Sequence, residues 1–487
     1  MTAASTWVSE RLGVGVHSGR SAAGISLDDL VGLAIRRNPR RAHLLVSTVL
    51  GKHVPTDPRL VYAAGRLLGF LAAGELTGTT RVAEAALASD VAGALARAVD
   101  AEPGAAARLL VAVDALHDVA GATPAGTVVV GYAETATALG HCVGEALAVP
   151  SLHSTRRPVP GVRPAAGFAE EHSHATEHLL LPEDPSFLTA AETVVLVDDE
   201  ISTGRTALNT IEALQADRPR GRYVVAALID LRTRADRETF AEVAARLGTR
   251  IDVVTLATGE ITLPAGILDE AARLVAEVVP SALVEQTAGQ ARPAHVEPER
   301  ETAAPSPAAV TRAPVTRFAT WPAQVRDGGR HGFLPDHEAP LVSAAREAAA
   351  VVGQGLVGDR VLVLGFEELM YAPLRIAQAL ADQVAAETLV RFSTTTRSPV
   401  LSVDDPGYAI RTTVTFPSHD DPDDGPGPRF AHNVAPGVDP ARRFTDIVVV
   451  IDSPADTAEL SMPGGLIDRV AGWCDHVHVV VIPAYRP

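Results

Sequence analysis

Short runs of β-branched and aliphatic residues alternate with helical patterns along most of the chain. In the first half, these runs lie at 127–130, 193–197, 223–229 and 251–256. Apolar residues at helical spacing follow the first run, at Leu139, Val143 and Leu147. Strands that alternate with helices indicate a parallel sheet with crossover helices. We therefore predict an α/β fold for residues 1–283, with a helical part at the N-terminus.

The same alternation returns toward the C-terminus. Apolar runs expected to form strands lie at 360–364, 388–392, 447–451 and 476–482. Pro373 stands where a helix would begin, since proline is favoured in a first helical turn. Residues 284–317 are instead rich in Ala, Pro, Glu and Arg, with almost no large apolar residue, which is typical of a linker. The prediction is a second, smaller α/β domain at 318–487.

Composition and charge narrow the class of protein. The formal net charge of -17 repels polyanions, which argues against a main task of coating nucleic acid or anionic membrane but allows a small anionic ligand. Cys142 and Cys474 show no metal-ligand spacing. No uncharged apolar run approaches the ~20 residues that span a bilayer, and the N-terminus lacks the apolar core of a secretory signal. We expect a cytoplasmic protein without membrane or nucleic-acid partners.

The segment 194–206 carries the clearest chemical signal. An apolar run leads into Asp198 and Asp199 and then into a small, hydroxyl-rich turn before a helical pattern. The turn consists of Ser202, Thr203, Gly204, Arg205 and Thr206. Ligands of open parallel sheets lie beyond the carboxyl ends of the strands, and amides at a helix start favour phosphate. Gly204 lets the backbone approach a ligand closely.

The two acids suggest what else this ligand carries. Carboxylates that faced a phosphate would repel it, whereas the vicinal hydroxyls of a ribose are good donors to Asp198 and Asp199. A phosphate cradle beside a diol clamp predicts a ribose 5-phosphate site. The alternative is that the acids only cap the following helix.

The run VVLVDDEISTGRT resembles the 5-phosphoribosyl-1-pyrophosphate (PRPP) signature of type I phosphoribosyltransferases, although Glu200 stands where most members carry an apolar residue. The chain resembles more closely a bacterial group with a C-terminal TRSP domain, found in gene clusters linked to tellurite and stress resistance. The segments that carry this likeness are 37–55, 171–178 and the literal TRSP at 396–399. The resemblance implies a type I fold and PRPP-dependent transfer to a base-like acceptor, giving a ribonucleoside-like product.

This resemblance also assigns roles to other residues. The pyrophosphate-binding loop of the family corresponds to Ala133, Glu134 and Thr135. A flap that closes over the site would hold Arg156, Arg157, Glu171, His172 and His174. The two arginines suit a leaving pyrophosphate. The acid and the histidines suit general acid/base catalysis or substrate contact, with a solvated loop or a zinc site through His174 and His178 as the alternatives.

Mg²⁺ is expected as the cofactor, because it is commonly held by substrate phosphates together with one or two carboxylates, here Asp198 and Asp199. Lys52 and His53 are local positive groups that either bind the acceptor or form a solvated face. The oligomeric state and the acceptor base are not indicated, and a homodimer is allowed. Two other functions remain open: a PRPP- or nucleotide-sensing regulator without turnover, and nucleosidase or phosphorylase chemistry.

The second domain resembles a degenerate copy of the first. Residues 364–368 are similar in character to 130–134, and 396–400 to 155–159. Residues 448–452 parallel 194–198 but lack the second acid and the TG turn. Under this hypothesis Glu368 and Arg397 bind the acceptor or complete the first site. Convergence of two α/β domains is the alternative.

Overall fold

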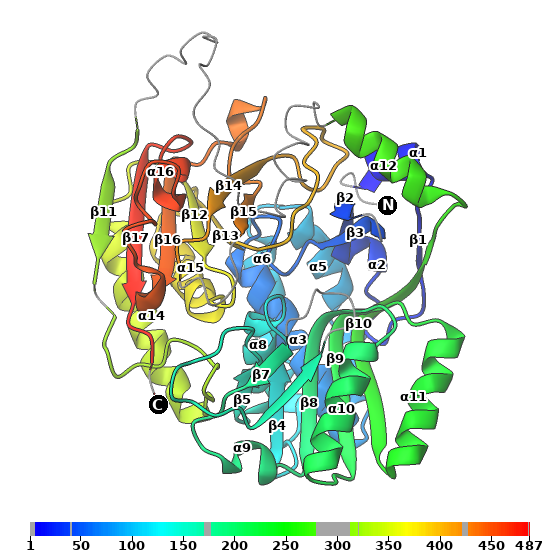
Figure 1. Cartoon of the computed structure of the whole chain (residues 1–487). Helices are drawn as coiled ribbons and strands as arrows, with labels where there is room; N and C mark the ends of the chain where they lie inside the picture. The colour runs from blue at the N-terminus through cyan, green and yellow to red at the C-terminus, as the bar shows by residue number, and fades with distance from the viewer. Residues whose placement is uncertain are drawn as a thin grey trace, which may run out of the picture.

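The protein forms two α/β units that pack side by side (Figure 1). A computed structural model describes residues 5–38, 41–169, 177–278, 312–319, 321–420, 427–485 and 487. The first unit is built on a six-stranded sheet and the second on a five-stranded sheet. The predicted α/β class is thus confirmed for both.

The first sheet has the order β1-β10-β9-β8-β4-β5. Its strands are β1 (Gly15–Ser18), β4 (Thr127–Gly131), β5 (Ser151–His153), β8 (Thr193–Ile201), β9 (Arg222–Asp230) and β10 (Arg250–Thr262). All neighbours are parallel except β1, which runs antiparallel to β10. The four strands expected from the apolar runs are therefore all present.

Helices cover both faces of this sheet because alternate strand residues point to opposite sides. Val195 and Val197 belong to the core cluster that contains α3 (Pro58–Thr77) and α8 (Thr137–Leu147). Val194 and Leu196 pack with α10 (Arg205–Asp217) and α11 (Arg234–Leu247) on the other side. Among the described helices α3 is long and apolar enough to cross a bilayer, but most of it is buried in this core.

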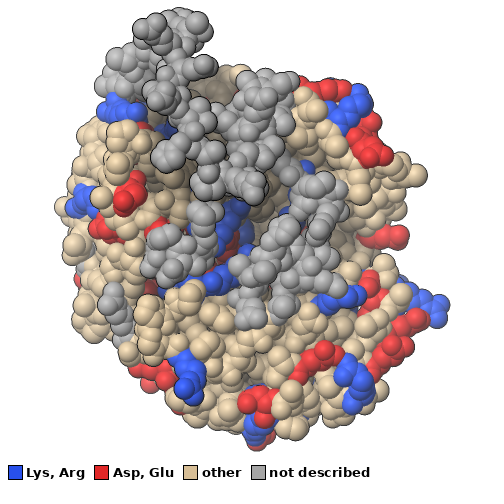
Figure 2. All heavy atoms as spheres, viewed as in Figure 1, with Lys and Arg blue, Asp and Glu red and all other residues tan. Residues whose placement is uncertain are grey.

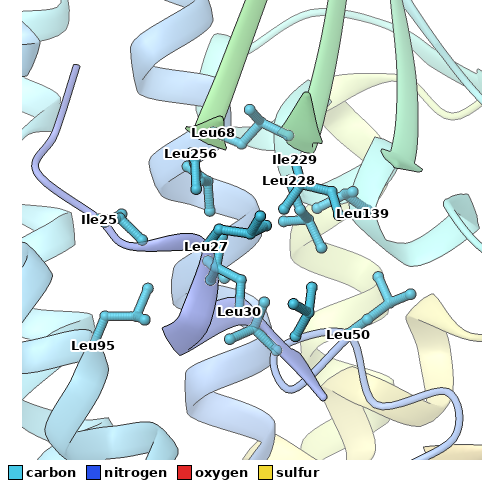
Figure 3. Packing of buried hydrophobic residues seen from close by; sticks show 14 of the residues in the cluster. Ile25, Leu27, Leu30, Leu50, Leu68, Leu95, Leu139, Leu228, Ile229 and Leu256 are labelled. Atoms are coloured by element: carbon cyan, nitrogen blue, oxygen red, sulfur yellow. The ribbon is translucent and has the colours of Figure 1, made fainter. Parts of the chain in front are cut away.

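Shorter helices surround these layers. They are α1 (Thr6–Leu12), α2 (Leu27–Leu30), α4 (Arg81–Ala88), α5 (Val91–Val99), α6 (Ala105–Asp114), α7 (His117–Ala120), α9 (Ser186–Thr189) and α12 (Ile267–Val278). Figure 3 shows Leu27 and Leu30 of α2 among Leu68, Leu228 and Leu256. This packing fixes the segment before β2 (Val31–Asn38) and β3 (Arg41–Ser47), a hairpin near the carboxyl ends of the sheet.

The second sheet is parallel throughout, with the order β11-β17-β16-β12-β13. Its strands are β11 (Val315–Phe318), β12 (Arg360–Gly365), β13 (Leu389–Thr394), β16 (Asp446–Asp452) and β17 (His476–Ile482). The helices α14 (Glu338–Gly353) and α15 (Tyr371–Gln383) cover one face, and α16 (Leu466–Val470) covers the other. Residues 315–317, which the composition assigned to the linker, pair with β17 and belong to this domain.

Four strands have the same arrangement in the two units. The order β9-β8-β4-β5 in the first sheet corresponds to β17-β16-β12-β13 in the second. Each unit also carries an antiparallel hairpin, formed by β6 (Ala166–Ala169) with β7 (Glu177–Leu180), and by β14 (Thr413–Pro417) with β15 (Pro428–His432). Thr155 bridges to β7 as Thr396 bridges to β15. This agreement supports the hypothesis that the second unit is a degenerate copy of the first.

Candidate functional site

A cavity of about 600 Å³ lies beyond the carboxyl ends of β4 and β8, between the two units. Such a volume is ordinary for a small-molecule site. Figure 2 shows Lys and Arg side chains in the hollow at the centre of this face, beside acidic ones. The first unit supplies most of the lining, and the second contributes Thr396, Arg397 and Ser398.

The predicted acidic pair lies at the end of β8. This strand continues past the apolar run to Ile201, so that Asp198, Asp199 and Glu200 lie near its carboxyl end. All three are half-buried and line the cavity. An Asp198 Oδ1 atom accepts a hydrogen bond of 2.9 Å from the Asp199 backbone amide, which fixes the orientation of the first carboxylate. The acids are therefore placed where a diol could reach them.

The predicted phosphate cradle follows directly. Residues 202–206 line the same cavity, and α10 begins at Arg205 with Gly204 as its N-cap. Gly204 has a φ of 78°, and a Cβ there would lie 2.4 Å from the Phe240 ring. Only glycine fits this turn without strain. The N-terminal end of a 13-residue helix thus lies at the cavity, in an environment that favours an anion.

The loop assigned to pyrophosphate forms the opposite wall. Ala133, Glu134 and Thr135 all line the cavity. Glu134 is only 6% exposed, and its carboxylate is contacted by Lys52 Nζ at 3.5 Å and Arg397 Nε at 3.2 Å. Lys52 also donates a 2.8 Å hydrogen bond to Thr135 Oγ1. Two cations therefore offset the one buried carboxylate of this loop.

The flap residues separate into three groups. Arg156 lines the cavity. Among the described residues the cavity lining does not include Arg157, whose guanidinium instead contacts Glu367 at 2.9 Å and Asp420 at 2.6 Å. Arg157 thus belongs to a buried ion cluster with these two carboxylates of the second unit. Glu171, His172 and His174 lie outside the described residues.

The acceptor candidates are also divided. Lys52, His53 and Arg397 line the cavity, but among the described residues Glu368 is not part of its lining. Burial would raise the pKa of Glu368, yet the charges of Arg330, Arg157 and His153 hold it at about 2. This carboxylate is engaged by the hydroxyl of Thr155 at 2.7 Å.

His53 differs from the other acceptor candidates in its charge. Burial, followed by the nearby His432 and Lys52, holds the pKa of His53 well below its usual value. His53 is therefore a neutral imidazole at neutral pH, so it offers a hydrogen-bonding group to an acceptor rather than a charge.

Several lining residues were not predicted as site residues. The β2–β3 hairpin and the loop after it contribute Arg36, Leu44, Leu45, Ser47 and Leu50. The other such residues are Tyr132, His178 and Ser398. At the hairpin, the sequence shows a cluster of basic residues at 36–41, which does not by itself identify a site. His178, the last histidine of the predicted flap, is hydrogen-bonded through Nδ1 to Ser154 Oγ at 2.9 Å.

The described residues contain no group of three or more His, Cys, Asp and Glu side chains arranged to hold a metal ion. A cation at this cavity would need ligands from the substrate. Asp198 and Asp199 suit this role because carboxylate oxygens are preferred by hard divalent ions.

Two family models match the chain. Residues 30–260 match the model described as phosphoribosyl transferase, and residues 327–470 match the TRSP domain that lies C-terminal to it. Each match lies within one of the two α/β units. A comparison with curated proteins gave no match.

Among solved structures, the chain is similar to an adenine phosphoribosyltransferase from Trypanosoma brucei in complex with AMP, pyrophosphate and ribose-5-phosphate. The identity is 17%, over 27% of this chain and 56% of that chain, with a TM-score of 0.20. An adenine phosphoribosyltransferase from Rhodothermus marinus gives 22% identity over 26% of this chain and 68% of that one, with a TM-score of 0.17. An orotate phosphoribosyltransferase from Aeropyrum pernix gives 22% identity over 30% of this chain and 65% of that one, with a TM-score of 0.16.

Proposed function

Because the chain is a phosphoribosyl transferase domain joined to a TRSP domain, we propose that it transfers the phosphoribosyl group of PRPP to a base-like acceptor and releases pyrophosphate. One observation carries this proposal. The acidic end of β8 and the phosphate cradle at 202–206 open into a single cavity with the loop at 133–135. The 5-phosphate, the ribose diol and the diphosphate of PRPP each have a complementary group there.

The chemistry follows from this placement. The 5-phosphate binds the amides and hydroxyls of 202–206, and the ribose hydroxyls donate to Asp198 and Asp199. The bond between C1 and the diphosphate oxygen breaks with its electron pair leaving on the diphosphate, and a nitrogen or carbon nucleophile of the acceptor forms the new bond at C1. The two acids stabilise the positive charge that develops on the ribose.

Cationic side chains that line the cavity would bind the leaving diphosphate. Lys52 and Arg397 contact the loop 133–135, and Arg156 lines the same cavity. Fixed cations there stabilise the charge that grows on the departing diphosphate without reorganising during the reaction. Mg²⁺, held by the substrate phosphates and by Asp198 and Asp199, would neutralise part of the diphosphate charge.

The double variant Asp198→Asn, Asp199→Asn tests the site. Hydrogen bonds to charged groups contribute about 1.5–3 kcal/mol each, so we expect PRPP affinity to fall at least about 100-fold. Titration calorimetry with PRPP and Mg²⁺ measures this change. Asp217→Asn, an exposed aspartate at the far end of α10, is the matched control and should bind as the parent does.

Turnover is tested separately, by screening purine, pyrimidine and unusual bases for pyrophosphate release from PRPP. A parent protein that binds PRPP but releases no pyrophosphate with any base would favour the sensor alternative. A double variant that binds PRPP as tightly as the parent would refute the assignment of the two acids.

A further inference from the structure

Two equivalent contacts join the units, one in each direction. Thr396 Oγ1 of the second unit donates to Glu134 of the first at 3.2 Å. Thr155 Oγ1 of the first unit donates to Glu368 of the second at 2.7 Å. Each threonine hydroxyl also accepts from the backbone amide two residues later. Reciprocal contacts of this kind are what a two-fold interface between subunits produces.

The backbone around these contacts repeats as well. The amide of Ser154 donates to the carbonyl of Gly131, and that of Thr395 donates to the carbonyl of Gly365. The hydroxyl of Ser154 accepts from the amide of Ala133 at 2.9 Å, and that of Thr395 accepts from the amide of Glu367 at 3.2 Å. The loops after β4 and β12 are therefore held in the same way, and the two units face each other through them.

The two loops nevertheless have different surroundings. Glu134 opens onto the large cavity. In the second unit, the equivalent loop includes Phe366. The guanidinium carbon of Arg157 lies 5.4 Å from the centroid of the Phe366 ring, and the centroid of the His419 ring lies 4.6 Å from it. Asp452, which ends β16 as Asp198 ends the apolar part of β8, accepts from the Ala455 amide and caps a short helix. At the equivalent place in the second unit, Glu368 and Asp452 line only a small pocket of about 20 Å³.

The second unit contributes side chains to the cavity of the first unit, among them Arg397. Arg397 Nε lies 3.2 Å from Glu134 and 2.8 Å from Glu367, a carboxylate with no exposed surface. Burial would raise the pKa of Glu367, but Arg157, Arg397 and Arg429 outweigh it and hold the pKa below its usual value. An ionised Glu367 anchors Arg397 from behind, while Arg397 also lines the cavity.

This arrangement matters for an anionic ligand. Without partners, the carboxylate of Glu134 would repel a diphosphate bound at its own loop. Thr396 and Arg397 engage both carboxylate oxygens of Glu134 from the second unit, and Lys52 contacts it from the first. The loop is thereby fixed and its charge offset before a ligand arrives, which is preorganisation.

We propose that Thr396 and Arg397, the first two residues of the TRSP sequence, are positioning residues of the transferase site. They hold Glu134 and its loop for the diphosphate, so the second domain takes the place that a partner subunit would have in a two-fold dimer. This inference rests on the proposed function.

The test compares ligands with and without a diphosphate. Thr396→Val removes the hydroxyl but keeps the shape of the side chain, and Thr396→Ser restores the hydroxyl. We expect Thr396→Val to weaken the binding of pyrophosphate and of PRPP, each with Mg²⁺, about tenfold, since one hydrogen bond to a charged group is lost. The affinity for ribose 5-phosphate should stay within twofold of the parent. Thr396→Ser should recover most of the pyrophosphate affinity.

Thr445→Val is the matched control, because the Thr445 hydroxyl bonds the backbone of Arg360 at the far end of the second sheet. It should leave all three affinities unchanged. Equal loss for ribose 5-phosphate and pyrophosphate in Thr396→Val, or no loss for either, would overturn the inference while leaving the proposed function intact. Arg397→Gln should lose more pyrophosphate affinity than Thr396→Val, because Arg397 also lines the cavity that would receive the diphosphate. A parent that binds none of these ligands would instead refute the proposed function, and the inference with it.

Discussion

Gly204 shows how a single residue shapes the phosphate cradle. Its positive φ and its contact with Phe240 leave no room for a side chain. A Cβ at this position must displace either the ring or the turn that presents the helix amides. The position of the cradle is therefore coupled to the packing of α11 behind it, because Phe240 belongs to that helix.

We expect Gly204→Ala to weaken the binding of ribose 5-phosphate at least tenfold and to lower the free energy of unfolding by about 1–3 kcal/mol. Gly248→Ala is the control for backbone strain alone. Gly248 has a φ of 63° but open space around its Cβ position, and it lies at the end of α11 away from the cavity. It should lose stability without losing affinity, as calorimetric titration and urea unfolding would show. Equal affinities in the two variants would contradict the assigned role.

At the scale of elements, the β2–β3 hairpin depends on the second unit. The Ile35 amide donates to the Tyr408 hydroxyl at 2.7 Å, and this hydroxyl donates to the Leu401 carbonyl at 2.8 Å. The Leu401 amide in turn donates to the Ile35 carbonyl. Leu44 and Leu45 of the hairpin line the cavity. The second unit therefore helps to hold the wall that the hairpin forms.

Tyr408→Phe should weaken this wall. The buried Ile35 amide would lose its acceptor, which costs about 1–3 kcal/mol of stability. Hydrogen exchange should accelerate in residues 31–35 and 44–47, and urea unfolding should show the loss of free energy. Tyr485→Phe removes a hydroxyl that donates to the half-exposed Glu183, so its effect should stay below about 0.5 kcal/mol. Unchanged exchange in the hairpin would contradict the dependence.

At the scale of the whole molecule, the two units share a core. Val61, Tyr62 and Cys142 of the first unit belong to the same buried cluster as Tyr371 and Leu374 of the second. Above this cluster Glu145 of α8 accepts hydrogen bonds from four side chains. They are Tyr62, Arg66 at 3.1 Å, Tyr371 at 3.0 Å and Arg375 at 3.1 Å. An interface of this kind couples the unfolding of both units.

We therefore expect one cooperative thermal transition, with equal calorimetric and van't Hoff enthalpies. Tryptophan fluorescence offers a second probe. A Trp7→Phe variant reports only from Trp321 and Trp473 in the second unit. Its fluorescence midpoint should coincide with the midpoint from far-ultraviolet circular dichroism, which follows both units. Two separate transitions would show that the units unfold independently.

Local patterns were enough to predict the eight strands expected from apolar runs, because buried parallel strands are continuous apolar segments. It also placed Asp198, Asp199 and the cradle at 202–206 together, since these residues are contiguous and a strand end followed by a helix start leaves little conformational choice. The match of strand order between the units was likewise anticipated from short similar segments.

Which other side chains meet at this site depends on the three-dimensional packing of the two units. Arg156 and Arg157 are neighbours in sequence, yet one lines the cavity and the other enters a buried ion cluster. The contact of Lys52 and Arg397 with Glu134 joins residues from distant parts of the chain. Such contacts depend on how two separately formed sheets dock and on which way each side chain points, and no local pattern in the sequence carries that information.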